Sequence, residues 1–128
     1  MTFSAQTILA VGAGGFLGAV LRFYVNTQVA KNFPGDLPLA TLGVNLLGSF
    51  LIGALIAIFI YYSVSDTTRA FLITGFLGAL TTYSTFAIES YFLLNTSLLL
   101  ALGNMALNLF GTIVAAGSGY KLFLYLLK

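Results

Sequence analysis

The residues best suited to chemistry gather in segment 74–86, which reads Thr-Gly-Phe-Leu-Gly-Ala-Leu-Thr-Thr-Tyr-Ser-Thr-Phe. Its hydroxyl side chains can bond backbone carbonyls and so compete with a helix, while Gly75 and Gly78 lower helix propensity. The pattern predicts a helix that breaks near the middle of an apolar stretch. Freed carbonyls at such a break coordinate cations, and half-helix N-termini favour anions. The alternative is a continuous helix with a Ser/Thr-rich packing face.

Two aromatic rings follow the predicted break. Tyr83 and Phe86 stand three residues apart, so they share one helix face. An aromatic ring carries partial positive charge along its edge, and these edges can therefore line a path for an anion without any formal charge. The alternative is that both rings only pack against neighbouring helices.

Further polar groups lie inside apolar stretches. Arg22 either snorkels to the surface or concentrates anions at a pore mouth. Glu89 is an intramembrane carboxylate and so a functional candidate, or it pairs with a partner subunit. Asn45 carries two amide protons, which suit either a buried anion or an interhelical hydrogen bond. A polar stripe at helical spacing, which must face protein or water, follows in the last stretch: Asn104, Asn108 and Thr112.

Membrane helices must position these residues. Of the 128 residues, 59% are hydrophobic and 6% are charged, whereas a soluble domain carries about 25% charged residues. About 20 apolar residues cross the hydrocarbon core of a bilayer. Four stretches are that long: 7–30, 39–62, 69–94 and 97–127. We therefore expect a single transmembrane domain over residues 1–128, in which Asp66 caps the third helix.

The composition also excludes several functions. The chain contains no Cys, His or Trp, so thiol and imidazole nucleophiles and the usual zinc and haem ligands are absent. A net charge of +2 is too small for nucleic-acid binding, and the loops are too short to hold a catalytic domain. We expect neither an enzyme nor a nucleic-acid partner.

The distribution of charge bears on membrane orientation. Arg69, Lys121 and Lys128 lie on one side of the predicted membrane, and Lys31 lies on the other. This bias is weak, so the chain is expected to insert in both orientations. Small residues, including a Gly-x-x-x-Gly pair in the first span, predict close helix packing.

Four motifs, in order, resemble the Fluc (CrcB) family of fluoride channels over essentially the whole chain. They are Gly-Gly-Phe-Leu-Gly-Ala-Val-Leu-Arg at 14–22, Thr-Leu-Gly-Val-Asn-Leu-Leu-Gly at 41–48, segment 74–86 with Glu89, and Asn-Leu-Phe-Gly-Thr at 108–112. The resemblance implies a fluoride-selective channel that exports fluoride passively down its electrochemical gradient. It further implies an all-α membrane protein with four transmembrane helices, the third broken at the midplane. Such chains form antiparallel, dual-topology homodimers with two antiparallel pores, embedded in the lipid of the bacterial inner or plasma membrane.

The resemblance also implies site residues. A structural Na⁺ at the dimer centre would be held by the backbone carbonyls of Gly78 and Thr81, and Arg22 would lie in the vestibule. The implied anion pathway comprises Asn45, Tyr83, Ser84, Thr85, Phe86, Asn108 and Thr112. The chain departs from the family at Ala79, where a second glycine is usual, and at Tyr83, where a phenylalanine is usual. The tyrosine keeps the ring edge and adds a hydroxyl.

Fluoride is small and strongly hydrated, so its pore must replace water with strong hydrogen-bond donors, which the Asn45 amide and the hydroxyl side chains supply. The competing hypothesis is a small proton-coupled multidrug exporter, which needs a carboxylate in its first span. The first span here contains no Asp or Glu, and Arg22 would repel cationic drugs. A purely structural subunit is disfavoured, because polar groups without a function are costly inside lipid.

Overall fold

The computed structural model describes residues 3–128, which contain helices and no strand. Four segments are long and apolar enough to cross a membrane: Ala5–Asn32, Leu39–Tyr61, Asp66–Leu94 and Leu98–Leu126. Their ends lie within three residues of the predicted ends, so the prediction of four membrane-spanning helices is confirmed. The first span is α1 (Ala5–Asn32) and the second is α2 (Leu39–Tyr61).

The third and fourth spans are each built from several helical pieces. The third comprises α3 (Asp66–Arg69), the π-helix η1 (Ala70–Leu77), α4 (Gly78–Leu80) and α5 (Tyr83–Leu94). The fourth comprises α6 (Leu98–Ala106), the π-helix η2 (Leu107–Gly111) and α7 (Thr112–Leu126). Of the four spans within residues 3–128, only the third is interrupted, between α4 and α5. The pieces of the fourth follow one another without a gap.

Hydroxyl side chains fix where several helices begin. Ser4 caps α1 in a capping box with Thr7. Ser65 caps α3 by accepting a hydrogen bond from the Thr68 amide at 3.1 Å. The prediction that Asp66 caps this helix is therefore wrong by one residue. Asp66 is instead the first helical residue, where its negative charge complements the helix dipole.

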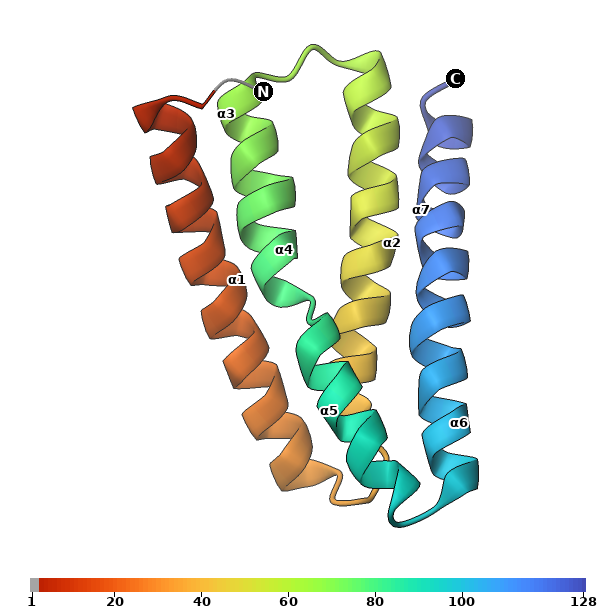
Figure 1. Ribbon diagram of the computed structural model, residues 1–128. Coiled ribbons are helices and arrows are strands. Elements are labelled where there is room, and N and C mark those ends of the chain that lie inside the picture. The colour runs from red at the N-terminus through yellow and green to blue at the C-terminus, as the bar shows by residue number, and fades with distance from the viewer. Residues whose placement is uncertain (1–2) are drawn as a thin grey trace.

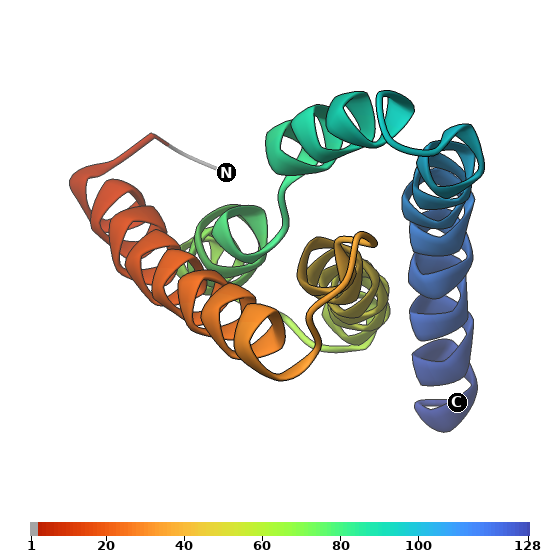
Figure 2. The ribbon, with the colours of Figure 1, turned by 90° about the horizontal axis from the view of Figure 1, so that it is seen from below.

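The helices stand in an open row, with α1 and α7 at opposite ends and with α2 and the third span between them (Figure 1, Figure 2). The start of α1, the end of α7 and the α2–α3 connection lie at one end of the bundle. The α1–α2 and α5–α6 connections lie at the other end. Seen along the bundle, α5 is displaced sideways from α4 and leads toward α6 (Figure 2).

Glycines allow two pairs of helices to approach until their main chains touch. A Cβ atom on Gly14 or Gly18 of α1 would collide with main-chain atoms of the third span, and one on Gly75 would collide with α1. Between α2 and α7, Gly53 and Gly119 are enclosed in the same way by main-chain atoms of the opposite helix. The predicted close packing through small residues is confirmed.

The break in the third span consists of two extended residues. Thr81 has φ −79° and ψ 157°, and Thr82 has φ −152° and ψ 116°. The predicted break near the middle of the third span is therefore present, and it falls at two hydroxyl residues of segment 74–86. Gly75 lies inside η1 and Gly78 opens α4. The break divides the third span, near its middle, into two helical segments.

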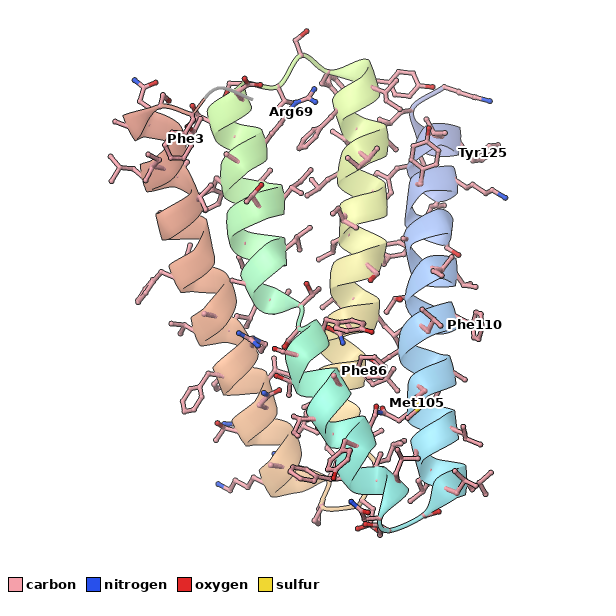
Figure 3. The ribbon with its side chains drawn as sticks, viewed as in Figure 1. Phe3, Arg69, Phe86, Met105, Phe110 and Tyr125 are labelled. Carbon is pink, nitrogen blue, oxygen red and sulfur yellow. The ribbon has the colours of Figure 1, made fainter. Side chains whose placement is uncertain are left out.

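Arg69 closes the end of the bundle where the second and third spans connect. Its Nη2 donates to the Phe59 carbonyl at 3.4 Å and its Nε donates to the Val64 carbonyl at 3.3 Å. The guanidinium carbon also lies 5.0 Å from the centroid of the Phe59 ring. Figure 3 shows this side chain reaching from α3 toward the end of α2. A cation at a helix C-terminus is favourable, so Arg69 fixes the turn between these spans.

Candidate ion pathway

A groove of about 590 Å³ lies between α2, both halves of the third span and the fourth span. Seven of the predicted site residues line it: Asn45, Gly78, Thr81, Tyr83, Phe86, Asn108 and Thr112. Phe86 from α5 and Met105 from α6 project toward the space between these two helices (Figure 3). The remaining lining is largely apolar and includes Leu77, Leu109 and Ile113.

The Asn45 amide brackets the break from the neighbouring helix. Its Oδ1 accepts the main-chain N–H of Thr82 at 2.8 Å, and its Nδ2 donates to the Thr82 carbonyl at 3.1 Å. One side chain therefore satisfies both main-chain groups of the extended residue. An unpaired main-chain group inside lipid costs several kcal/mol. By pairing both groups of Thr82, Asn45 removes this cost and stabilises the break at this depth.

The same hydrogen bonds free carbonyl oxygens before the break. In a continuous helix the Thr82 amide would bond the Gly78 carbonyl, and the Thr85 amide would bond the Thr81 carbonyl. The Thr82 amide instead donates to Asn45 Oδ1, and the Thr85 amide donates to Thr82 Oγ1 at 3.3 Å. Gly78 and Thr81 therefore keep oxygen ligands that suit a hard cation.

Three asparagines extend the polar contacts away from the break. Asn45 Nδ2 donates to Asn108 Oδ1 at 2.9 Å. Asn108 Nδ2 donates to the side-chain Oδ1 of Asn104 at 3.0 Å and to its carbonyl at 3.1 Å. Asn104 Nδ2 donates in turn to Ser90 Oγ at 3.0 Å. All four side chains are buried, so the stripe on the fourth span faces protein at these positions.

The aromatic pair lies at the start of α5. The ring centroids of Tyr83 and Phe86 are 5.4 Å apart and the rings are inclined by 71°, an edge-to-face contact. Tyr83 is 78% exposed, whereas Phe86 is half-buried. Both rings, whose edges carry partial positive charge, therefore line the groove beside the break.

Four predicted site residues lie outside the groove lining. Ser84 is exposed, and Thr85 accepts a hydrogen bond from the Thr82 hydroxyl at 2.9 Å. Arg22 is half-buried on α1. Glu89 lines a separate cavity of about 210 Å³, together with Asp36 from the α1–α2 connection.

Glu89 is held from the second span. Thr41 Oγ1 donates to Glu89 Oε1 at 2.8 Å. The other carboxyl oxygen, Oε2, is buried and has no hydrogen-bond partner within residues 3–128. The structure thus joins Glu89 to α2 and does not bring it to the groove.

Sequence reasoning missed several residues that organise this region. Thr41 and Ser90 were not singled out, and Asn104 was noted only as part of a stripe. Gly48 was also missed as a contact, although a Cβ there would collide with the Thr81 methyl group. A local signal existed for Thr82, since a threonine three residues before Thr85 at the start of a helix is a typical N-cap.

The sequence is similar to known proteins over most of its length. Residues 9–120 match the family model described as CrcB-like protein, Camphor Resistance (CrcB). The chain belongs to the CrcB family. A CrcB relative from Sulfurimonas denitrificans is 58% identical over 119 residues, which cover 91% of this chain and 92% of the relative. Relatives from Nautilia profundicola and Methanococcus maripaludis are 44% and 49% identical over 118 and 107 residues.

The three relatives are each named fluoride-specific ion channel FluC. The identity to the Nautilia relative covers 91% of this chain and 92% of the relative, and for the Methanococcus relative the shares are 83% and 86%. The resemblance drawn from the four motifs is therefore confirmed. With its four candidate spans, this CrcB chain is a multi-pass membrane protein.

Proposed function

We propose that the chain is a fluoride-selective ion channel and not an enzyme. The observation that carries the proposal is the groove at the broken third span, whose largely apolar lining includes the amides of Asn45 and Asn108 and the rings of Tyr83 and Phe86. Relatives that match nearly the whole chain are named for fluoride. A strongly hydrated anion needs replacement donors along its path, and the amides of Asn45 and Asn108 provide them.

The donors on the path are already engaged within the protein. Both Nδ2 protons of Asn45 are donated, one to Asn108 and one to Thr82. A fluoride ion that binds Asn45 therefore replaces one of these two acceptors. A compact anion then takes the place of a carbonyl oxygen as the partner of the Asn45 Nδ2 proton. Hydrogen bonds to a charged acceptor are stronger than those between neutral groups, so the exchange is favourable for an ion that has shed water.

The groove also supports an antiparallel homodimer. Polar side chains in a membrane face protein or water, yet this groove opens between helices of a single chain. A second copy covers it and makes two antiparallel pores, one for each groove. Weak charge asymmetry supports insertion in both orientations, and Arg69, one of its few cations, is engaged by the carbonyls of Phe59 and Val64. Flow down the electrochemical gradient needs no nucleotide motif.

A sodium ion fits the freed carbonyls at the break. Gly78 and Thr81 would supply main-chain oxygens from each subunit, and a bound cation would lend the region a fixed positive charge. The residues present suit the ion, since their usual amide partners are bonded to Asn45 and to the Thr82 hydroxyl.

The test is ion efflux from liposomes. Vesicles that contain the purified protein, loaded with potassium fluoride or potassium chloride, receive valinomycin, and ion-selective electrodes follow the release. We expect fluoride release and chloride retention. The variant Phe86→Ile should assemble normally but lose fluoride flux, because it removes the ring edge. Equal leakage of both ions, or uptake of cationic drugs coupled to protons, would reject the channel.

A further inference from the structure

The asparagine chain has one possible direction, and main-chain groups impose it. A main-chain N–H can only donate, so Asn45 must turn Oδ1 toward Thr82. A main-chain carbonyl can only accept, so Asn108 must turn Nδ2 toward Asn104. The bond between them, from Asn45 Nδ2 to Asn108 Oδ1, then fits both constraints. A flip of either amide would oppose donor to donor or acceptor to acceptor.

Asn104 and Ser90 complete this chain away from the groove. Both Nδ2 contacts of Asn108 end on Asn104, one on its carbonyl and one on its Oδ1. Asn104 is 0% exposed and Ser90 is 4% exposed, and neither lines the groove. A buried amide that loses its partner is destabilised unless it rotates toward another acceptor. Removal of the Asn104 side chain leaves Asn108 Nδ2 with the Asn104 main-chain carbonyl as its one remaining acceptor, so Asn108, and through it Asn45, is held less firmly.

The chain of amides connects α2, α5 and the fourth span. It starts at Thr82, which opens α5, passes through α2 and the fourth span, and returns to α5 at Ser90. The buried apolar cluster joins Val44 of α2 to Leu77 and Leu80, which precede the break. Beyond the break, the hydrogen bonds hold α5 beside the groove together with its apolar packing on α6, where Leu93 and Ala101 are buried.

We propose that Asn104 and Ser90 are positioning residues for the ion path: main-chain groups set the direction of the amide chain, and these two side chains hold Asn108 and Asn45 in place, and through Asn45 the main chain of the break. This inference rests on the proposed function for its transport readout. Neither residue touches the permeating ion. Each acts by keeping the Asn45 side chain in place beside the groove, where its Nδ2 protons stay bonded to Thr82 and Asn108 until an ion replaces one of these acceptors.

Matched substitutions at Asn104 separate positioning from packing. Asn104→Leu has a similar shape and no polar atoms, so Asn108 loses an acceptor. Asn104→Asp keeps an oxygen for Asn108, and its second oxygen can meet the Ser90 hydroxyl, which both donates and accepts. We expect fluoride flux to fall about tenfold in Asn104→Leu, the effect of one lost buried hydrogen bond, and to be higher in Asn104→Asp. Gly103→Ala, on the same helix with open space around it, is the control and should match the wild type.

Higher fluoride flux in Asn104→Leu than in Asn104→Asp would overturn the proposal. If Asn104 only filled space, the apolar variant would be tolerated and a carboxyl in a buried site would be harmful. Wild-type flux in Asn104→Leu would also reject positioning. Ser90→Ala gives a milder test with little risk to folding, and combining it with Asn104→Leu should cost no more than Asn104→Leu alone, since both disrupt one chain.

A second readout does not depend on transport. The Thr82 amide is bonded to Asn45 Oδ1, so its hydrogen exchange, followed by NMR of the full-length protein in lipid nanodiscs, reports whether Asn45 is held. Exchange should quicken about tenfold in Asn104→Leu, while the Ala54 amide in α2 stays protected. Unchanged Thr82 exchange would reject the inference, and a wild-type protein that fails to carry fluoride would reject the proposed function alone.

Discussion

The two halves of the third span are held by different kinds of contact. Before the break, main-chain atoms of η1 and α4 press directly on α1, and Gly14, Gly18 and Gly75 leave no room for a side-chain carbon between them. After the break, α5 is tied to α2 and the fourth span by side-chain hydrogen bonds at Thr82 and Ser90. One half is packed and the other is hydrogen-bonded.

This difference follows from what lipid permits. Lipid tails are as apolar as leucine, so helices associate in a membrane through close van der Waals contact or through interhelical hydrogen bonds. Close main-chain contact leaves no space for an ion and makes a fixed frame. Hydrogen-bonded groups can exchange partners with an ion. The chain uses the first kind of contact where it needs rigidity and the second where an anion is proposed to pass.

The largest expected effect comes from breaking the packed half. In Gly18→Val, side-chain carbons would occupy the place of the Phe76 carbonyl and crowd the Leu80 amide. Overpacking typically costs about 1–3 kcal/mol, and more where main chain must move. We expect loss of monodisperse protein on size-exclusion chromatography, whereas Gly12→Val, on the same helix with nothing within 4 Å, should purify normally. Normal recovery of Gly18→Val would mean that α1 and the third span are not closely packed.

Breaking the hydrogen-bonded half should reduce fluoride flux strongly while the helices still assemble through their packed contacts. Asn45→Ala removes the bonds to Thr82 and to Asn108. Several buried hydrogen bonds of about 1 kcal/mol each correspond to a loss of fluoride flux of about 100-fold, with the elution profile preserved. The fluoride electrode measures the flux, and Gly43→Ala on the same helix is the control. Flux within twofold of the wild type would remove Asn45 from the path.

The smallest expected effect on fluoride flux comes from a change at the edge of the groove, in the hydrogen-bonded half of the third span. Tyr83→Phe removes an exposed hydroxyl that has no hydrogen-bond partner within residues 3–128, and it keeps the ring that meets Phe86 edge to face. We expect flux within about threefold of the wild type, because a ring-edge contact is worth about 0.5–1.5 kcal/mol and is retained. A tenfold change in either direction would show that the hydroxyl itself meets the ion or the partner subunit.

Features that depend on local composition were predictable from the sequence. The spans followed from apolar length, and the break followed from the density of hydroxyl residues. The two glycines before the break were a weaker guide than the hydroxyl residues, because glycine has two uses in a membrane. It weakens a helix and it admits a neighbouring main chain, and Gly75 serves the second purpose. The cap of α3 was misplaced because Ser65 and Asp66 are adjacent and both residue types cap well.

Features that depend on distant contacts were not predictable. Asn45 and Thr82 are 37 residues apart, and Asn45 and Asn108 are 63 apart. An amide in an apolar helix shows that a polar partner is needed, but not which one. The bond from Thr41 to Glu89 lies across 48 residues and has no local signal. Only the fold reveals that the break is secured by an asparagine on another helix.

The amide chain also sets the order in which its hydrogen bonds can form while the protein is synthesised and inserted into the membrane. Asn45 can close on Thr82 once the third span has left the translocon, but its second proton finds Asn108 only after the last span has emerged. A nascent chain stalled between these points therefore holds a half-secured break in the bilayer. Completion of the C-terminal helix is the event that locks it, so truncated products should be unstable in the membrane and readily cleared by its proteases.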